Sequence, residues 1–494
     1  MDILYTPTYS YLHGYSNSFL HDALRTHMSW LEEDEYRKFT KAVPGFPIGK
    51  ETIFKITSTQ DLTVMSGYLM QFIKLLKAHK ESIHITSSVS KYKCSDIVPN
   101  EILYTHQKKI VTAAVTYNRG IIQSPTGSGK SFVIAELVNK YLDDNLQILV
   151  TVPTINLLHQ LTEDIKQYCE LIGKPVPEIG KVGDGKYDFK QITVGIPQSL
   201  CKSKCDTYLS NVQALVADEV HTCATPTYAS VITKMQHRLV SLGLSATPNI
   251  NGANNIFLTG FFGDPIIEVT EADMIQENII LEPLFKYYPA PKAFVPNNIS
   301  QFANRISELK ANHRYKVLNQ VYEYVISNNK GRNKLIVDLA IKKIKEEEVP
   351  LIIIVNKIRG EECHGMQLFK LLQESGYDLP IMAGHISKKK QEVILNELKE
   401  SKILGCIAGP KILSAGVNIP SLASIILAGA GKSDTEFVQR VGRLLRKKEG
   451  KERPEVIDFY DPQYWFSKQS YTRMSIAEDV YGYQNVIRVG ETQW

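Results

Sequence analysis

A short segment rich in glycine is the part of this sequence best suited to binding phosphate. The segment SPTGSGKS, Ser124 to Ser131, follows an apolar run and precedes a helical pattern. Loops of the form G-x-x-x-x-G-K-[ST] wrap phosphates with backbone N–H groups, place a lysine on the terminal phosphates and a hydroxyl on Mg²⁺. Lys130 and Ser131 supply these two groups, but Ser124 replaces the first glycine, so the match is incomplete by itself. The residues expected to contact the nucleotide here are Thr126, Gly127, Ser128, Gly129, Lys130 and Ser131.

A second segment, AGAGKSDT at residues 428–435, resembles the first but has a structural explanation. Too few residues follow LAGA to wrap a triphosphate. Ser433 and Glu436 form an S-x-x-E capping box, which places Ser433 at the start of a helix rather than on a metal ion. We therefore expect the nucleotide at the first segment.

Two adjacent carboxylates provide the second half of a hydrolytic site. The apolar strand in ALVADEVH ends in Asp218 and Glu219, at the carboxyl edge of a parallel sheet, where open α/β sheets bind their ligands. Asp218 can hold Mg²⁺, usually through water, and Glu219 can orient and deprotonate the water that attacks the γ-phosphate. With the phosphate loop, this pair predicts ATP hydrolysis with Mg²⁺ held by Ser131 and Asp218.

The helix expected in EFVQRVGRLLRK has two different sides. At about 100° per residue, one side is apolar and would anchor the helix, while Gln439, Arg443 and Arg446 cluster on the other. A solvated charged face is the alternative explanation of these cations. Because an acidic, phosphate-binding site is expected elsewhere in the chain, we interpret them as catalytic. The apolar side comprises Phe437, Val438, Val441, Leu444 and Leu445.

Composition places few limits on the partner. The chain has 494 residues, 43% of them hydrophobic and 22% charged, which is ordinary for a globular protein of several domains. The net charge of +5 leaves room for a local basic channel. The amino-terminal residues lack the unbroken apolar core of a signal peptide, and the longest apolar runs have strand length, so we expect a soluble intracellular protein without membrane contact.

Apolar strands alternate with amphipathic helices in two stretches of the chain, which predicts an α/β fold with two doubly wound parallel sheets. The first would occupy residues 98–275 and the second 311–460. Between them, a linker is expected at 276–310, because prolines recur in PLFKYYPAPKAFVPNNIS. Residues 1–97 form a separate small α+β unit, and 461–494 are a tail without a readable motif.

The order and spacing of SPTGSGKS, DEVH, SAT and QRVGRLLR resemble those of the superfamily 2 helicases and translocases over residues 100–460. That resemblance implies two tandem RecA-like domains. The first would bind ATP, and the arginines of the second would complete the ATP site. In that superfamily serine or alanine commonly replaces the first glycine of the loop, so Ser124 becomes expected. The resemblance also implies an ATP-dependent nucleic-acid motor.

Weaker motifs extend the resemblance. YTHQ is similar to the adenine-reading segment, which implies that Gln107 contacts the base. VPTINLLHQ and VGIPQSL resemble backbone-tracking segments, SAT a coupling segment and ILSAGVNIPS a nucleotide-contacting segment in which Asn418 replaces a frequent aspartate. The residues implied by these motifs are Pro153, Thr154, Gln198, Ser199, Ser245, Thr247 and Gly416.

The compact form, DEVH and GRLLRK are similar to the phage UvsW-type recombination helicases. This narrower resemblance implies branched DNA substrates, namely forks, displacement loops and four-way junctions, with residues 1–97 as an accessory DNA-binding domain. It further implies a monomer working with recombination or replication proteins in the cytoplasm of a bacterial host. Three alternatives remain: a duplex DNA translocase that does not separate strands, an RNA helicase, and a nucleic-acid clamp switched by ATP.

Overall fold

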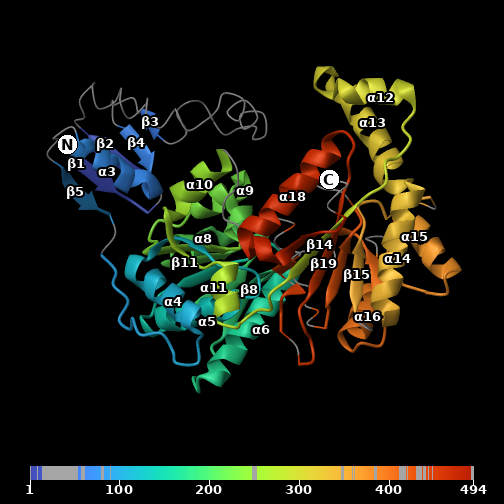
Figure 1. Cartoon of the computed structure of the whole chain (residues 1–494). Helices are drawn as coiled ribbons and strands as arrows, with labels where there is room; N and C mark the ends of the chain where they lie inside the picture. The colour runs from blue at the N-terminus through green and yellow to red at the C-terminus, as the bar shows by residue number, and fades with distance from the viewer. Residues whose placement is uncertain are drawn as a thin grey trace. The chain divides into compact units, whose positions relative to one another are not determined.

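The computed structural model divides into two compact units, Met1–Thr270 and Glu271–Trp494 (Figure 1). In the described part of the chain, no helix is both long and apolar enough to cross a membrane. The structure describes residues 2–7, 9–13, 54–56, 62–78, 83–88, 91–246, 253–346, 350–358, 360, 362–382, 386–410, 419, 421–429, 437, 441–442, 444–447 and 449–490.

The first unit begins with a small five-stranded sheet of order β3-β4-β2-β1-β5. Its side chains Ile3 and Met65 are buried in the same core as Phe257 and Phe261 of the following domain. The carbonyl oxygen of Pro7 accepts hydrogen bonds from two arginines of that domain. The small sheet is therefore packed onto the domain that follows it. Its elements are β1 Asp2–Tyr5, β2 Tyr9–His13, β3 Phe54–Ile56, β4 Leu62–Met65, η1 Ser66–Tyr68, α3 Leu69–Ala78 and β5 His84–Ser87.

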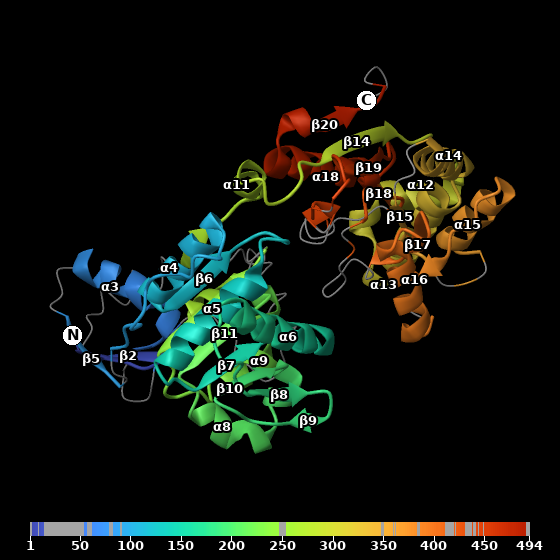
Figure 2. The same ribbon diagram turned by 90° about the horizontal axis from the view of Figure 1, so that it is seen from below.

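An eight-stranded sheet of order β13-β6-β12-β11-β7-β10-β8-β9 forms the rest of the first unit, and all its pairs are parallel except β8 with β9. Figure 1 shows α4, α5 and α6 on one face and α9 and α10 on the other, and the strands from β11 to β9 can be followed in Figure 2. The strands are β6 Arg119–Gln123, β7 Ile148–Thr151, β8 Ile179–Gly183, β9 Lys186–Tyr187, β10 Ile192–Gly195, β11 Ala214–Asp218, β12 Val240–Ser245 and β13 Pro265–Glu268. The helices are α4 Thr105–Tyr117, α5 Lys130–Asp143, α6 Ile155–Leu171, α7 Pro197–Leu200, η2 Ser203–Cys205, α8 Asp206–Ser210, η3 Val220–Cys223, α9 Pro226–Ile232 and α10 Ala253–Phe262.

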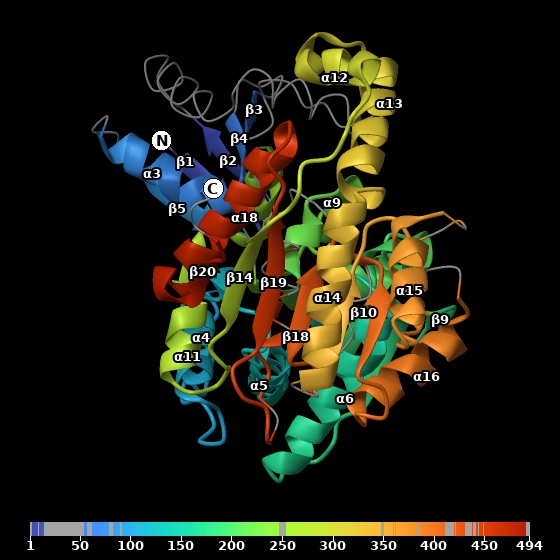
Figure 3. The ribbon, with the colours of Figure 1, turned by 45° about the vertical axis from the view of Figure 1, so that its right-hand side comes forward.

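The second unit contains a seven-stranded parallel sheet of order β16-β17-β15-β18-β19-β14-β20, with α14 and α15 alongside it in Figure 3. The strands are β14 Leu284–Pro289, β15 Leu351–Ile354, β16 Ile381–Met382, β17 Gly405–Ala408, β18 Ser424–Leu427, β19 Glu455–Tyr460 and β20 Val486–Arg488. The helical segments are α11 Glu271–Gln276, α12 Asn297–Asn304, η4 Ile306–Glu308, α13 Ala311–Tyr322, η5 Glu323–Ser327, α14 Lys330–Glu346, α15 His364–Glu374, α16 Lys388–Lys399, α18 Trp465–Tyr481 and η7 Tyr483–Asn485.

The two parallel sheets and the small mixed sheet confirm the predicted fold class, but two predicted segments differ. The expected linker, 276–310, contains β14, which pairs with β19 along its whole length. The expected tail, 461–494, contains α18 and β20, and β20 pairs with β14. Phe285 and Tyr287 are fully buried, so β14 is held in the sheet by its core although prolines flank it. Proline density marked the ends of this strand rather than a linker.

Candidate functional site

The phosphate loop lies between β6 and α5, so the backbone N–H groups at the start of α5 face the loop. Such helix ends bind anions because their first N–H groups have no partner within the helix. Gly127 and Gly129 have φ values of 88° and 75°, in the left-handed region that favours glycine. A Cβ atom on Gly129 would also lie 2.3 Å from Nε2 of Gln107. Both glycines are therefore required by the shape of the loop.

Two side chains tie this loop together. The hydroxyl of Ser124 donates to Oγ of Ser128 at 2.7 Å, and both residues are buried. Nζ of Lys130 donates to the carbonyl oxygens of Ser124 and Pro125, each at 3.0 Å. The serine that replaces the first glycine of the motif thus has a structural role. The ammonium of Lys130 is held across the loop, where phosphate oxygens could replace the carbonyls.

Gln107 and its neighbour His106 support the loop from α4. Oε1 of Gln107 accepts from the Tyr104 N–H at 3.0 Å, and its Nε2 donates to the Ser128 carbonyl at 2.9 Å. Nε2 of His106 lies 2.8 Å from the same carbonyl. Gln107 is only 2% exposed, so its observed contacts are with the protein, and its contact with a base stays a prediction. The sequence motif did not indicate His106.

The two carboxylates lie at the end of β11, where the sequence predicted them: Asp218 is its last residue and Glu219 follows it. Burial, and then the charge of Glu219, raises the pKa of Asp218 to about 7, while Lys130 opposes this shift. Oδ1 of Asp218 accepts from the N–H of Glu219 at 3.0 Å, and Glu219 itself has a left-handed backbone with φ of 49°. Among the described residues, the buried Oε2 of Glu219 has no hydrogen-bond partner. That oxygen is available to a water molecule.

His221 and Ser245 connect the acidic pair to the loop. Nδ1 of His221 lies 2.9 Å from Oγ of Ser245 and 3.4 Å from Oε2 of Glu219. The carbonyl of Ser245, at the end of β12, accepts from the N–H of Ser124 at 2.9 Å. Because β12 lies between β6 and β11, its last residue touches both halves of the site. Thr247, the other predicted coupling residue, lies outside the described residues.

The donor set around Ser131 suits a magnesium ion. Ser131 is the second residue of α5, and its hydroxyl and the Asp218 carboxylate are oxygen donors of the kind Mg²⁺ prefers. A third oxygen-bearing residue, Asp164 of α6, was not indicated by the sequence motifs. Burial raises the pKa of the Asp164 carboxyl, and a hydrogen bond with Ser131 opposes the shift. Thr126, the remaining loop residue, is half-buried between Pro125 and Gly127.

The segments expected to approach nucleic acid begin at neighbouring strand ends. Pro153 and Thr154 follow β7, and Gln198 and Ser199 lie on α7, directly after β10. The strands β7 and β10 pair in parallel, so these segments start at the same edge of the sheet. Oγ1 of Thr154 caps α6 by accepting from the N–H of Leu157 at 3.3 Å. Their contact with nucleic acid stays a prediction.

The arginine-bearing segment of the second unit is described only in part. Gly416, Gln439 and Arg443 lie outside the described residues. Arg446 does not continue the helix, since it forms an antiparallel bridge with Ile280. The predicted helical face through Arg446 is therefore corrected: the helix ends before this residue, and burial lowers the pKa of its guanidinium. The described members of the apolar side, Phe437, Val441, Leu444 and Leu445, are buried as predicted.

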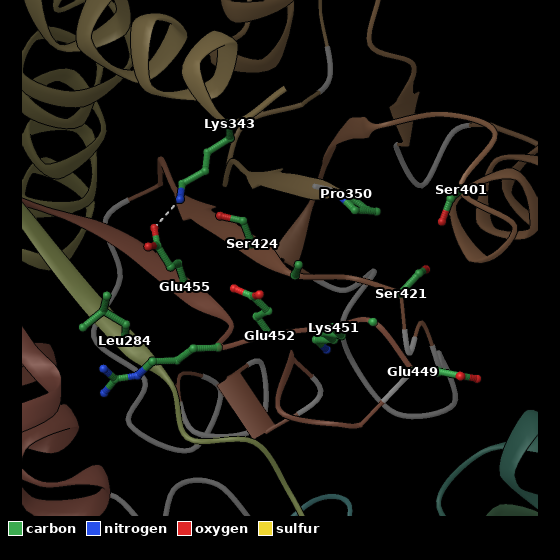
Figure 4. Close-up of a pocket in the computed structure, with 13 residues that line it drawn as sticks. Leu284, Lys343, Pro350, Ser401, Ser421, Ser424, Glu449, Lys451, Glu452 and Glu455 are labelled. Atoms are coloured by element: carbon green, nitrogen blue, oxygen red, sulfur yellow. Dashed lines mark ion pairs between the residues drawn. The ribbon is translucent and has the colours of Figure 1, made fainter. Parts of the chain in front are cut away.

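A pocket in the second unit lies at the opposite, amino edge of its sheet, where β14, β18 and β19 begin (Figure 4). Its half-buried carboxylate, Glu455, is ion-paired with Lys343 and accepts from Nζ of Lys286 at 2.6 Å. The charges of Lys343 and Glu455 therefore already neutralise one another. Because open α/β sheets bind ligands at their carboxyl edges, this pocket is a poor candidate for the nucleotide.

Comparison with known proteins identifies the two domains. Residues 100–250 match the family described as "Type III restriction enzyme, res subunit", and residues 331–448 match "Helicase conserved C-terminal domain". The first match contains the loop, the acidic pair and Ser245. The second contains the described part of the arginine segment. The two matches thus fall on the two parallel sheets, although β13 of the first sheet and β14, β19 and β20 of the second lie outside the matched residues.

Two relatives and one solved structure are similar over most of the chain. The "ATP-dependent DNA helicase uvsW" of Enterobacteria phage T4 is 24% identical over 72% of this chain and 68% of its own length. The "DNA 3'-5' translocase XPB2" of Sulfurisphaera tokodaii is 22% identical over 70% of this chain and 79% of its own. The solved structure of the restriction-modification enzyme LlaBIII bound to DNA superposes with a TM-score of 0.56 at 13% sequence identity. The match covers 86% of this chain and 36% of the LlaBIII chain, and it shows that the fold is shared. This chain therefore belongs to the superfamily 2 helicases and is an ATP-dependent nucleic-acid helicase.

Proposed function

We propose that this helicase uses ATP to drive strand exchange or separation in branched DNA, namely forks, displacement loops and four-way junctions. The observation that carries the proposal is the joining of the phosphate loop and the acidic pair through Ser245. Support for DNA as the substrate comes from the similarity to the phage T4 DNA helicase, and the branched form is what the resemblance to the recombination helicases implies. The small sheet adds further support, since it shares a core with the ATP-binding domain and could present DNA to it.

Each part of the site has a proposed role in hydrolysis. Ser131 and Asp218 would hold Mg²⁺, which would supply positive charge to neutralise the phosphates. Lys130 would exchange its two carbonyl partners for phosphate oxygens. Glu219 would hold the attacking water at its unpartnered Oε2 and accept its proton. His221 would keep that carboxylate oriented and would link it to Ser245, whose Oγ lies beside the same ring nitrogen.

Residues beyond this cluster complete the proposal. Gln439, Arg443 and Arg446 would stabilise the charge that develops on the γ-phosphate, as arginines do in related phosphoryl transfers. Gly416 and Gln107 would contact the nucleotide. The candidates for the nucleic-acid backbone and for coupling are Pro153, Thr154, Gln198, Ser199, Ser245 and Thr247. A monomer acting beside recombination or replication proteins in a bacterial cytoplasm belongs to the same proposal and rests on the resemblance alone.

A DNA translocase is a rival function, because a relative at 22% identity carries that name. A translocase would hydrolyse ATP on duplex DNA without separating strands. The purified protein should therefore be assayed for ATP hydrolysis and strand separation with no nucleic acid, single-stranded DNA, duplex, a four-way junction and matched RNAs. We expect the junction to give the strongest stimulation together with unwinding. Stimulation by plain duplex without separation would favour the translocase, and stimulation by RNA alone would overturn the DNA assignment.

Glu219→Gln separates binding from hydrolysis in the same assay. The amide retains the shape of the side chain but cannot accept the proton of the attacking water. We expect ATP binding close to that of the wild type and turnover lower by about 10²–10⁴-fold, the usual contribution of a general base. Fluorescent-nucleotide binding and phosphate release measure the two quantities. Turnover within a few-fold of the wild type would contradict the role given to Glu219.

A further inference from the structure

The helical hairpin α12–α13 has a surface unlike the rest of the second unit. It is inserted between β14 and α14, and Figures 1 and 3 both show it extending beyond the sheet. Residues 291–322, which contain it, carry five cations and one acid, whereas the whole chain has a net charge of +5. The segment therefore has a net charge of +4, five cations less one acid. The cations are Lys292, Arg305, Lys310, Arg314 and Lys316, and the acid is Glu308.

These cations are free to bind an anion. All five are exposed, and none forms an ion pair with any described residue. Elsewhere in the second unit the cations Arg332, Lys343 and Arg473 form ion pairs with carboxylates of the protein. Unpaired exposed cations retain their full charge for a ligand. A polyanion is the partner that this charge distribution fits.

Aromatic rings lie among the cations. Phe294 is 83% exposed, Tyr315 is 70% exposed and Phe302 is 44% exposed. The rings of Phe302 and His313 are in contact, with centroids 4.8 Å apart, and this contact joins α12 to α13. Bases of single-stranded nucleic acid stack on exposed aromatic rings of this kind.

The hairpin is anchored firmly at its base. It has a small core of its own, in which Val317 and Val321 of α13 pack with Phe466 of α18. Oη of Tyr464 donates to Oγ of Ser300 at 3.0 Å, and the side chain of Gln463 bonds the backbone of residue 293 in both directions. A fixed support reduces the entropy lost when the surface binds a ligand.

The hairpin also starts at the edge of the sheet that binds ligands. Pro289, the last residue of β14, pairs with Tyr460, the last residue of β19, so the hairpin and its anchor both leave the carboxyl edge. Open α/β sheets bind ligands at this edge. The exposed rings, the unpaired cations and the position at this edge all favour single-stranded nucleic acid as the partner.

We propose that the α12–α13 hairpin is a contact site for a single strand of DNA, in which Phe294 and Tyr315 stack on bases while the cations bind the backbone. A surface of this kind would hold an unpaired strand at a branch without reading its sequence. The inference rests on the proposed function, because it assigns to the hairpin the strand that the helicase acts on.

The test compares variants of the full-length chain. In Phe294→Ala/Tyr315→Ala, the dissociation constant for a labelled single-stranded oligonucleotide should rise about tenfold or more, since stacked bases commonly contribute that much. Tyr483→Ala is the matched control, because Tyr483 is 68% exposed in the same unit but outside the hairpin, and it should bind as the wild type does. ATP turnover without DNA should be equal in all three proteins, which shows that they are folded.

A second variant tests the cations separately. In Lys310→Gln/Arg314→Gln, the slope of log affinity against log salt should decrease by about 0.7 for each phosphate that the variant no longer neutralises. Wild-type affinity and slope in both hairpin variants would overturn the inference. That result differs from failure of the proposed function, in which DNA would not stimulate ATP turnover by the wild type at all. Photo-crosslinking of an iodouracil oligonucleotide to residues 294–315 should succeed in the wild type, and labelling only elsewhere would also overturn the inference.

Discussion

The two large sheets of this protein both carry carboxylates near their carboxyl edges, but the surroundings of these carboxylates differ. In the second unit, Asp458 of β19 is bound by Arg473 at 2.6 Å, and Asp461, just after this strand, is bound by Arg332 at 2.7 Å. In the first unit, Asp218 at the end of β11 has no ion pair with any described residue and accepts from a backbone N–H. One sheet satisfies its acidic groups internally, whereas the other leaves them for a ligand.

This difference shows that two copies of the same fold can have different roles, one holding the protein together and the other carrying the hydrolytic site. A buried carboxylate paired with arginine holds neighbouring elements together, and removing one partner leaves an uncompensated charge. A partly buried carboxylate that forms no ion pair with the protein keeps its charge available to a metal ion such as Mg²⁺. The paired acids of the second sheet thus mark it as a framework, and the unpaired acids of the first mark the hydrolytic site.

The largest expected effect comes from breaking a pair in the second sheet. In Arg473→Met, Asp458 would remain buried without its cation, so the free energy of unfolding of the second unit should fall by about 3–5 kcal/mol. Urea unfolding followed by a probe in that unit measures this change. The matched variant Arg473→Met/Asp458→Asn removes the stranded charge and should recover much of the loss. If the single variant unfolds like the wild type, the framework role of this pair is wrong.

In the first sheet, Lys130→Ala should affect catalysis and leave stability almost unchanged. Lys130 donates to two loop carbonyls and forms no ion pair with any described residue, so its loss breaks no salt bridge. We expect ATP turnover to fall by about 10²–10³-fold or more, as when an electrostatic donor is removed from a reaction centre. The control Lys108→Ala removes a lysine of α4 whose ion pair with Glu101 is on the surface, and should leave turnover unchanged. Wild-type turnover in Lys130→Ala would exclude the loop as the ATP site.

Sequence patterns predicted the parts of this contrast that depend on local spacing. Contiguous residues encode the glycine loop, the pair Asp218–Glu219 and the alternation of strands and helices. The positions of these features in the fold follow from strand order. The pairs Arg473–Asp458 and Arg332–Asp461 could not be predicted in this way, because they join residues that are distant in the chain or belong to a segment without a motif. Strand β14 was missed because tertiary burial outweighs its flanking prolines.

The pH dependence of stability should sharpen the contrast further. Burial and Glu219 raise the pKa of Asp218 from 3.8 to about 7. Between these values the folded protein holds a proton that the unfolded chain has lost, so stability falls as the pH rises through this range. Asp218→Asn removes this titration, and its free energy of unfolding should decrease less than that of the wild type from about pH 4 to pH 7. The exposed Asp378→Asn should follow the wild type. Identical pH profiles for wild type and Asp218→Asn would contradict the unpaired state of this carboxyl.

The smallest expected effect is that of Ser124→Ala, which tests the phosphate loop beside Asp218 and Glu219. Removing the hydroxyl leaves Oγ of the buried Ser128 without its 2.7 Å partner, at a cost of about 1 kcal/mol. Because the bond shapes the loop and takes no part in chemistry, ATP affinity should fall about fivefold while the rate of the bound complex stays nearly constant. Ser124→Ala/Ser128→Ala should cost less than the sum of the two single variants, since each single change already breaks the same bond. Strictly additive losses in ATP affinity would show that the serine at the first glycine position does not organise the loop through Ser128.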